Sequence, residues 1–183
     1  MKKILKLTVL TILLLGFTQI SNARVSYYQG DIDLFLGTGA TTGLGFCPVY
    51  LGTNYMIMDF LSVGAEAGFR MDSKNFYTHY NSWGHYQYKR NGFVFVTHGD
   101  YHFNELLSIP PKYDVYAGVD VGIAIFSDYM YEGKIYNETN NYILAGLHVG
   151  ARWMFKRNLG LNLQTGFRTN DDLNVQFGLT FKL

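Results

Sequence analysis

The 183-residue chain has a single cysteine, three prolines and few charged residues, which make up 16% of it. The lone Cys47 excludes an intrachain disulfide framework and a cysteine-based zinc cluster. Because 15 basic and 14 acidic residues nearly cancel, the chain lacks the strong positive field that nucleic-acid binding requires. Beyond the first 23 residues, no window reaches the ~18 consecutive apolar residues of a transmembrane helix, so we expect none there.

Residues 1–23 predict a cleavable secretory signal peptide. The start is positively charged because it contains three lysines, Lys2, Lys3 and Lys6. Residues 7–17 form a largely apolar run of 11 residues, which is too short to span a bilayer as a helix. Ser21 and Ala23 provide the small side chains that signal peptidase requires, so we expect cleavage after Ala23. The alternative interpretation of this segment is a membrane anchor or a buried helix.

The rest of the chain is rich in stretches with a period of two. In residues 173–183 every odd position is apolar, and every even position is polar or glycine. Residues 159–168, 115–125 and 143–155 follow the same pattern with few exceptions, as strands do when their two faces meet different surroundings. The alternation predicts eight strands, near residues 30–39, 47–58, 60–72, 87–103, 113–127, 141–155, 159–168 and 173–183.

The expected connections alternate in length, as they do in an up-and-down barrel. With the N-terminus in the periplasm, the turns on that side fall at residues 59–60, 104–112 and 156–158. The loops on the outer side fall at residues 39–45, 72–86, 128–140 and 169–172. Long outer loops with tight inner turns are typical of outer-membrane barrels. Pro48 cannot donate a ladder hydrogen bond, so its strand should begin after it or carry a bulge.

Alternation alone leaves open which face of the barrel lies inside. A soluble barrel of the lipocalin kind would bury the apolar face, but its exterior would then carry many glycines and few charges. Aromatic residues also cluster near both ends of the apolar faces. Those near the periplasmic rim are Tyr101, Phe103, Trp153, Phe155 and Phe181, and those near the outer rim are Phe69, Phe93 and Phe167. Two such girdles indicate a barrel whose apolar face contacts lipid.

Residues 24–183 resemble the small eight-stranded outer-membrane proteins of the OmpA/OmpX type, the outer membrane protein beta-barrel domain superfamily. The resemblance rests on the signal peptide, the eight alternating segments and the closing strand at residues 175–183, although Leu183 stands where phenylalanine is usual. It implies an all-β fold, an eight-stranded antiparallel up-and-down transmembrane β-barrel preceded by a cleavable signal peptide. It also implies a porin-like monomer in the cell outer membrane of a Gram-negative cell. Its partners would be outer-membrane lipid, lipopolysaccharide and, during biogenesis, the barrel-assembly machinery.

The inward positions of the expected barrel carry many charged and polar side chains. Unpaired charges are costly in a narrow lumen, so we predict that these groups pair in a lumenal polar network. The network residues are Glu66, Arg70, His98, Asp100, Asp120, His148, Arg152 and Arg168, and Asp33, His102 and Lys182 also face inward. We expect three layers from the periplasmic end, and they are a low layer of Asp100, Arg152 and Lys182, a middle layer of Glu66, His98, Asp120, His148 and Gln164, and a higher layer of Arg70 and Arg168. The alternative is a pathway for protons or solutes.

Catalysis is the rival hypothesis, because some small outer-membrane barrels hydrolyse or transfer lipid A acyl chains. Such a hydrolase needs a serine nucleophile, a histidine base and an acidic residue at the lipid-facing surface. The deacylase pattern His-x-Ser does not occur, and His79 and Ser82 lie in an expected loop without an acid beside them. His98, Asp100 and His102 share one strand face and could bind zinc, but a packed polar lumen is the simpler interpretation. We therefore predict no enzymatic activity, no cofactor and no metal.

The expected outer loop at residues 75–86 is rich in Tyr, Asn, Ser and Trp, a composition that suits protein contact. Its candidate contact residues are Tyr77, Tyr80, Trp83 and Tyr86. In the alternative interpretation, the strands continue above the membrane and these rings pack on each other. The basic residues at the outer rim would either meet lipopolysaccharide phosphates or be ordinary solvated charges, and they are Lys74, Lys89, Arg90 and Lys134.

Together these features predict a non-enzymatic outer-membrane barrel that acts as an envelope component or through surface loops that bind a protein ligand. The alternatives are a lipid A-modifying enzyme and a narrow pore.

Overall fold

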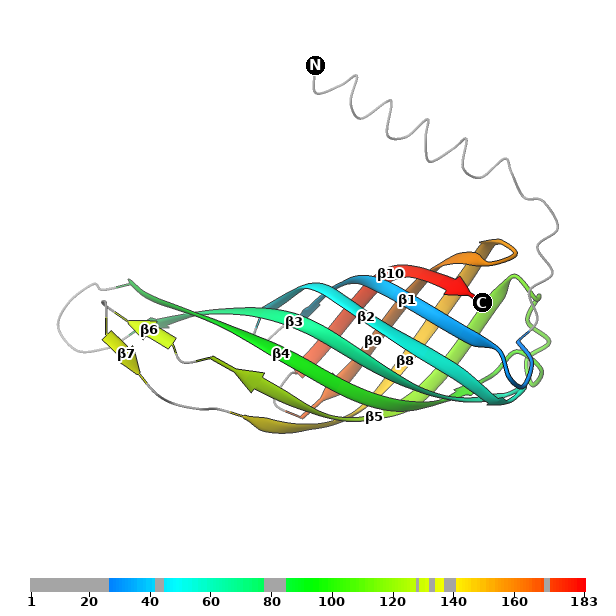
Figure 1. Cartoon of the computed structure of the whole chain (residues 1–183), viewed down its shortest axis with the longest axis horizontal. Coiled ribbons are helices and arrows are strands. Elements are labelled where there is room, and N and C mark those ends of the chain that lie inside the picture. The colour runs from blue at the N-terminus through cyan, green and yellow to red at the C-terminus, as the bar shows by residue number, and fades with distance from the viewer. Residues whose placement is uncertain are drawn as a thin grey trace, which may run out of the picture.

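The alternating segments form a closed antiparallel β-barrel (Figure 1). The computed structural model describes residues 27–41, 45–77, 85–127, 129–131, 134–136, 141–169 and 172–183. Among these residues, no helix is long and apolar enough to cross a membrane. The predicted signal peptide, residues 1–23, lies outside the described residues and stays a prediction.

Eight strands make the barrel, as the alternation predicted. They are β1 (Ile32–Thr41), β2 (Gly45–Met58), β3 (Leu61–Tyr77), β4 (His85–His102), β5 (Tyr113–Phe126), β8 (Tyr142–Lys156), β9 (Leu159–Arg168) and β10 (Asp172–Lys182). Each pairs with its neighbour in this order, and β10 pairs with β1, so the topology is up-and-down. Two short strands, β6 (Tyr129–Tyr131) and β7 (Lys134–Tyr136), form a further antiparallel pair within the expected loop at residues 128–140.

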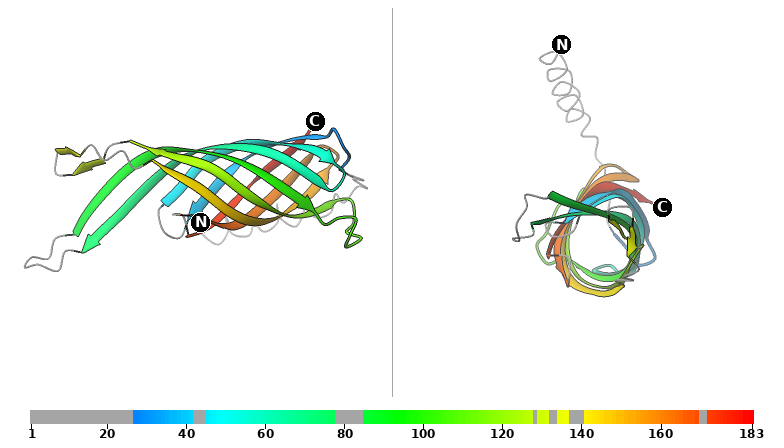
Figure 2. Two further views of the ribbon diagram at one scale, coloured as in Figure 1. Left: turned by 90° about the horizontal axis from the view of Figure 1, so that it is seen from below. Right: turned by 90° about the vertical axis from the view of Figure 1, so that its left-hand side faces the viewer.

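The strands close into a ring, which the end-on view in Figure 2 shows, and the closed ring is staggered. From Leu36 on β1, successive partners through β2, β3, β4 and β5 lead to Ile143 on β8. The opposite route, through β10 and β9, leads to Trp153 on the same strand, ten residues further along. The strands therefore tilt strongly, and residues that share a hydrogen-bonded row lie at different depths.

Pro48 lies inside β2 at a bulge, which was one of the two predicted outcomes. The register of β2 against β3 shifts between Phe46 and Val49, and the register against β1 shifts beside Gly39. Because proline has no amide hydrogen, a bulge near the rim of the barrel is where a strand can accept it.

The two ends of the barrel differ. The C-terminus and the tight turns after β2 and β8 lie at one end, which we call the periplasmic end because short turns face the periplasm in outer-membrane barrels. At the opposite, outer end, β3 and β4 extend as a hairpin well beyond the rest of the barrel (Figures 1 and 2). The expected loop boundaries at residues 72–86 are therefore wrong, because β3 and β4 continue to pair with each other up to Tyr77 and His85.

The apolar face of the barrel points outward. Leu51, Phe93 and Leu147 are 60%, 55% and 65% exposed, whereas the alternate positions are buried. Outward rings meet near the periplasmic end, where Tyr101 and Phe103 have centroids 5.1 Å apart. An exterior of this kind is stable in lipid and not in water, so the lipocalin-like alternative is wrong.

Candidate functional site

The barrel interior is polar because inward positions on most strands carry charged or amide side chains. Seven of the eight predicted network residues are buried, and they are Glu66, Arg70, Asp100, Asp120, His148, Arg152 and Arg168. The side chain of the eighth, His98, is 7% exposed. Charges in such an interior must pair with one another. They form two clusters, one near the periplasmic end and one at mid-depth.

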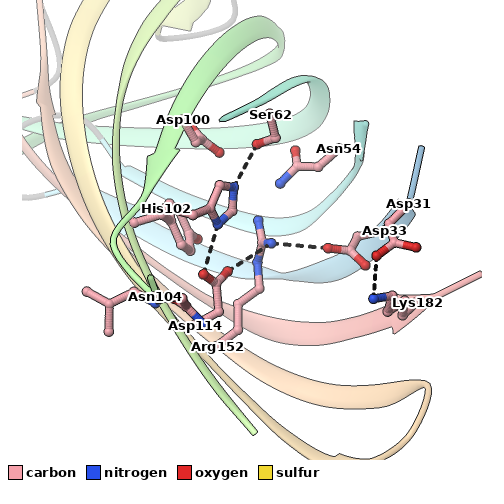
Figure 3. Close-up of polar contacts among 12 residues, drawn as sticks. Asp31, Asp33, Asn54, Ser62, Asp100, His102, Asn104, Asp114, Arg152 and Lys182 are labelled. Atoms are coloured by element: carbon pink, nitrogen blue, oxygen red, sulfur yellow. Dashed lines mark hydrogen bonds and ion pairs between the residues drawn. The ribbon is translucent and has the colours of Figure 1, made fainter. Parts of the chain in front are cut away.

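Arg152 on β8 is the centre of the periplasmic cluster (Figure 3). Its Nη1 donates to Asp33 Oδ2 on β1 at 3.1 Å and to Asp114 Oδ2 on β5 at 3.2 Å. All three residues are at most 3% exposed, so each charge depends on its partners. Asp114 is missing from the predicted set, although it has the same parity as Asp120 on β5. The alternation could therefore have identified it.

The same cluster contains a chain of hydrogen bonds from serine to histidine to aspartate (Figure 3). Ser62 Oγ lies 3.0 Å from His102 Nε2, and His102 Nδ1 lies 2.8 Å from Asp114 Oδ1. A carboxylate only accepts, so Nδ1 donates to Asp114 and Nε2 accepts from the Ser62 hydroxyl in the neutral ring. This is the order of groups in a serine hydrolase.

The surroundings of this chain are those of a packed interior. Ser62 and Asp114 are fully buried, and Ser62 faces the lumen rather than lipid. Asp114 also binds Arg152, and the ring of Tyr27 stacks on His102 with centroids 5.8 Å apart. An ester would have to displace these groups to reach Ser62 Oγ. The hydroxyl therefore serves as a hydrogen-bond partner in this structure.

Residues 27–31 precede β1 and fold back into the periplasmic mouth of the barrel. Gly30 has a φ of 94°, a left-handed conformation that glycine adopts without strain and that lets the chain reverse. The backbone of Met56 on β2 holds the segment, since Met56 O accepts from Gly30 N at 2.8 Å and Met56 N donates to Asp31 O at 2.9 Å. Tyr27 is consequently only 8% exposed, and burial raises the pKa of its phenol, which keeps the ring neutral.

The Tyr27 ring covers the cations of the periplasmic cluster. Its centroid lies 4.7 Å from Lys182 Nζ and 5.7 Å from Arg152 Cζ. Arg152 Cζ also lies 4.5 Å from the ring centroid of Tyr116, which is buried on β5. Contacts of this kind stabilise cations that are removed from water. Lys182 additionally pairs with Asp31 at 2.5 Å, so the end of β10 and the segment before β1 are joined at the mouth.

His148 is the centre of the mid-depth cluster. Its Nε2 lies 2.9 Å from Asp100 Oδ1 on β4, and its Nδ1 lies 3.0 Å from Asp120 Oδ1 on β5. Both ring nitrogens therefore face carboxylates, and the carboxylates favour a ring that is protonated at both. Asp100, which we expected in one layer with Arg152 and Lys182, contacts His148 because Asp100, Gly118 and His148 are successive partners on β4, β5 and β8.

Arg168 continues this cluster toward the outer end. Its Nε donates to Asp120 Oδ2 at 2.8 Å, and its Nη1 lies 3.5 Å from Glu66 Oε1. Glu66 Oε1 also accepts from Gln176 Nε2 at 2.9 Å. We expected Arg168 above the carboxylates, but its long side chain reaches down to them. Six strands, β3, β4, β5, β8, β9 and β10, are thereby linked through one polar chain.

The predicted set His98, Asp100 and His102 does not converge on a point. His98 Nε2 contacts the amide of Asn54 at 2.6 Å and lies 3.9 Å from Asp100 Oδ2, whereas His102 belongs to the periplasmic cluster. Positions i and i+4 of a strand are separated by about 13 Å, which is too far for one metal ion. Within the described ranges, no group of three or more His, Cys, Asp or Glu side chains could hold a metal ion.

The outer half of the lumen contains a cluster of buried apolar side chains. They come from β4, β5 and β8 and are Val94, Val96, Ala124, Phe126 and Leu144, with Tyr142 packed against them. Arg70 lies over the Phe126 ring at 5.6 Å and donates to Thr41 Oγ1 at 3.3 Å. Beside Arg70, Glu66 and Arg168 a cavity of ≈ 30 Å³ remains, which is room for about one water molecule. The sequence prediction missed this apolar cluster because it expected a polar lumen throughout.

The predicted contact residues are only partly described. Tyr77 ends β3, and Tyr86 is the second residue of β4, so both belong to the protruding hairpin. Tyr80 and Trp83 lie outside the described residues.

The fold, the apolar exterior and the paired polar interior define a small eight-stranded outer-membrane β-barrel protein, located in the cell outer membrane. No protein-family model matches the sequence, and no curated protein matches it. Solved structures do share the fold. OprG from Pseudomonas aeruginosa aligns with a TM-score of 0.63 at 10% identity, over 87% of this chain and 99% of that one.

Two further outer-membrane barrels are similar to this chain. The N-terminal β-barrel domain of Pseudomonas aeruginosa OprF aligns with a TM-score of 0.55 at 10% identity, over 85% of this chain and 98% of that one. Ail, the attachment invasion locus protein of Yersinia pestis, aligns with a TM-score of 0.52 at 11% identity, over 85% and 99%. At these identities the likeness shows the fold, which hosts many functions.

Proposed function

We propose that this protein is a non-enzymatic outer-membrane barrel that binds a protein ligand through its β3–β4 hairpin. The observation that carries the proposal is the length of these two strands. The last pair between β2 and β3 is Phe46 with Met71, so from Asp72 to Tyr77 β3 pairs with β4 alone. The backbone of β3 therefore has an edge without a neighbouring strand among the described residues.

A protruding hairpin suits recognition for two physical reasons. Continuous pairing up to Tyr77 and His85 stiffens the hairpin, so a ligand would not have to order a long loop. Its sequence from residue 75 to 86 is rich in Tyr, Asn, Ser and Trp, which make large contacts at low entropic cost. Lys74, Lys89 and Arg90 flank it, and we propose that they meet lipopolysaccharide phosphates at the membrane surface.

The two alternative functions are less well supported. A lipid A-modifying enzyme needs its nucleophile at the lipid-facing surface, whereas the Ser62–His102–Asp114 chain faces the lumen. A narrow pore needs a continuous bore, whereas ion pairs and the apolar cluster lie across the described lumen. A monomer embedded in outer-membrane lipid and assembled by the barrel-assembly machinery fits the proposed role.

The test removes the hairpin without touching the barrel. Replacing residues 74–88 by Asn-Gly keeps the pair between Ser73 and Lys89 and the contact of Lys89 with Met130 on β6. The matched control shortens residues 128–140 instead. Both variants are expressed in a deletion strain that is assayed for adhesion, serum survival and envelope integrity.

We expect both variants to insert in the outer membrane, and only the hairpin variant to lose adhesion or serum survival. A hairpin variant that inserts and keeps every phenotype would overturn the proposal. Loss of the phenotype in the control alone would move the contact site to residues 128–140.

A further inference from the structure

The outward face of the barrel is hollowed over β2, β3 and β4. The groove has a volume of ≈ 590 Å³ and is lined by residues of five neighbouring strands, from Leu34 on β1 to Ile123 on β5. Its volume lies within the range of small-molecule binding sites. Its accessible surface is almost entirely apolar, although Thr53, Thr97 and the buried Glu66 are among the lining residues.

The register explains why this part of the wall is hollow. Thr53, Ala65 and Thr97 are direct partners on β2, β3 and β4, so three small outward side chains stand in one row. In the next row, Ala67 stands between Leu51 and Phe95, which rise on both sides of it. Small residues therefore form the floor, and large residues form the walls.

The hydroxyl group of Thr97, in the floor of the groove, already has a hydrogen-bond partner. Its Oγ1 donates to the carbonyl of Val121 at 3.0 Å, so the hydroxyl is satisfied within the sheet. The opposite wall of the barrel differs, because Leu163 and Phe167 on β9 are 53% and 67% exposed and project outward. β9 is four strands from β3 in either direction.

We propose that this groove is a binding site for one acyl chain of an outer-membrane lipid. The groove is continuous with the lipid-facing exterior, which is the protein–lipid interface of this barrel. An empty apolar hollow would lose dispersion contacts, and water gains no hydrogen bonds there. The occupant is therefore hydrocarbon from the surrounding membrane.

The shape of the groove favours a chain over a second copy of the protein. It runs along the hydrogen-bonded rows across five strands, about 19 Å at the usual strand spacing, and therefore climbs obliquely around the barrel. A flexible acyl chain can follow that curve along its length. A second barrel is itself convex, so it would touch the groove over a short part only.

A photolabelling experiment tests the proposal. The intact barrel is reconstituted in phospholipid vesicles whose acyl chains carry a diazirine, irradiated, and mapped by mass spectrometry. Leu51, Phe95 and Ile123 line the groove and are 60%, 47% and 46% exposed. The comparison residues Leu163 and Phe167 are at least as accessible as Phe95 and Ile123, so a difference in labelling would report retention of the chain and not access.

We expect several-fold more labelling at the groove residues than at Leu163 and Phe167. The double variant Ala65→Leu, Ala67→Leu fills the floor from the lipid side and should abolish the excess. Ala145→Leu, an outward substitution on β8 outside the groove, should leave it unchanged. A gel-mobility shift on heating shows that each variant has folded.

Equal labelling of the groove residues and of Leu163 and Phe167 would overturn the proposal. Excess labelling at the groove residues that survives in the double variant would overturn it as well. A photoreactive amino acid introduced at position 51 that cross-links two copies of the protein would assign the groove to a second copy instead. The proposal depends on the location of the barrel in lipid and not on the function of the hairpin. Its failure would therefore be distinguishable from failure of the proposed ligand binding.

Discussion

The guanidinium of Arg152 lies against the ring of Tyr27, with 5.7 Å between Cζ and the ring centroid. The two residues come from opposite ends of the sequence, and the contact exists because residues 27–31 fold back into the periplasmic mouth. A neutral ring thus covers a buried ion cluster where it would otherwise meet water. Tyr27 closes the barrel at the end where the strands are joined by tight turns.

Replacing Tyr27 tests this closure. Tyr27→Ala removes a buried ring and should lower the free energy of unfolding by about 3 kcal/mol, measured by urea denaturation in detergent micelles. It should leave ion conductance in planar bilayers unchanged, because the ion pairs at mid-depth and the apolar cluster in the outer half of the lumen remain. Tyr27→Phe keeps the ring over both cations and is the control, with little change expected in either measurement. An alanine variant as stable as the wild type would show that the Tyr27 ring does not cover the buried ion cluster.

Two carboxylates of the mid-depth cluster should differ in their effect on stability. Glu66→Ala should lower the free energy of unfolding by about 2 kcal/mol. The loss is limited because Arg168 keeps its 2.8 Å bond to Asp120. Asp120→Ala should cost more, about 3–5 kcal/mol, since it leaves both Arg168 and His148 without a carboxylate that they now contact. The urea unfolding midpoints of the two variants check this order. Two unchanged midpoints would mean that the cluster is solvated.

The Ser62–His102–Asp114 chain makes a separate prediction. Ser62→Ala should destabilise the barrel by about 1–3 kcal/mol, because His102 Nε2 would lose its buried donor. A fluorophosphonate probe should fail to label the wild-type protein, since Ser62 is fully buried and its hydroxyl is bonded to His102. Labelling that disappears in the alanine variant would instead establish Ser62 as a nucleophile and revive the enzyme hypothesis.

Closure of the sheet predicts a heat-modifiable protein. All eight barrel strands are paired on both sides over most of their length, so the fold should resist dodecyl sulfate until it is heated. Boiled and unboiled samples of the outer-membrane fraction should therefore migrate differently on a gel. Recovery from the soluble periplasm, without a mobility shift, would contradict the barrel.

The strands and their faces could be predicted because period-two alternation is a local property. The segment from Leu173 to Leu183 shows it residue by residue, and the same parity separates lipid-facing from lumenal positions. Asp114 could have been placed by the same rule. The protruding hairpin could not, because its sequence is compatible both with a loop and with paired strands, and only pairing between β3 and β4 decides between them.

The sequence by itself determined the number of barrel strands, the direction of their side chains and the presence of buried charge, since each follows from the order of apolar and polar residues along one segment. The tertiary structure alone decided which charges meet. Arg152 binds Asp33, 119 residues away in the chain, because the sheet closes with a particular stagger. The groove over Ala65 has the same origin, because its floor depends on how the rows of β2, β3 and β4 align. Stagger is a property of the closed ring, and no single strand encodes it.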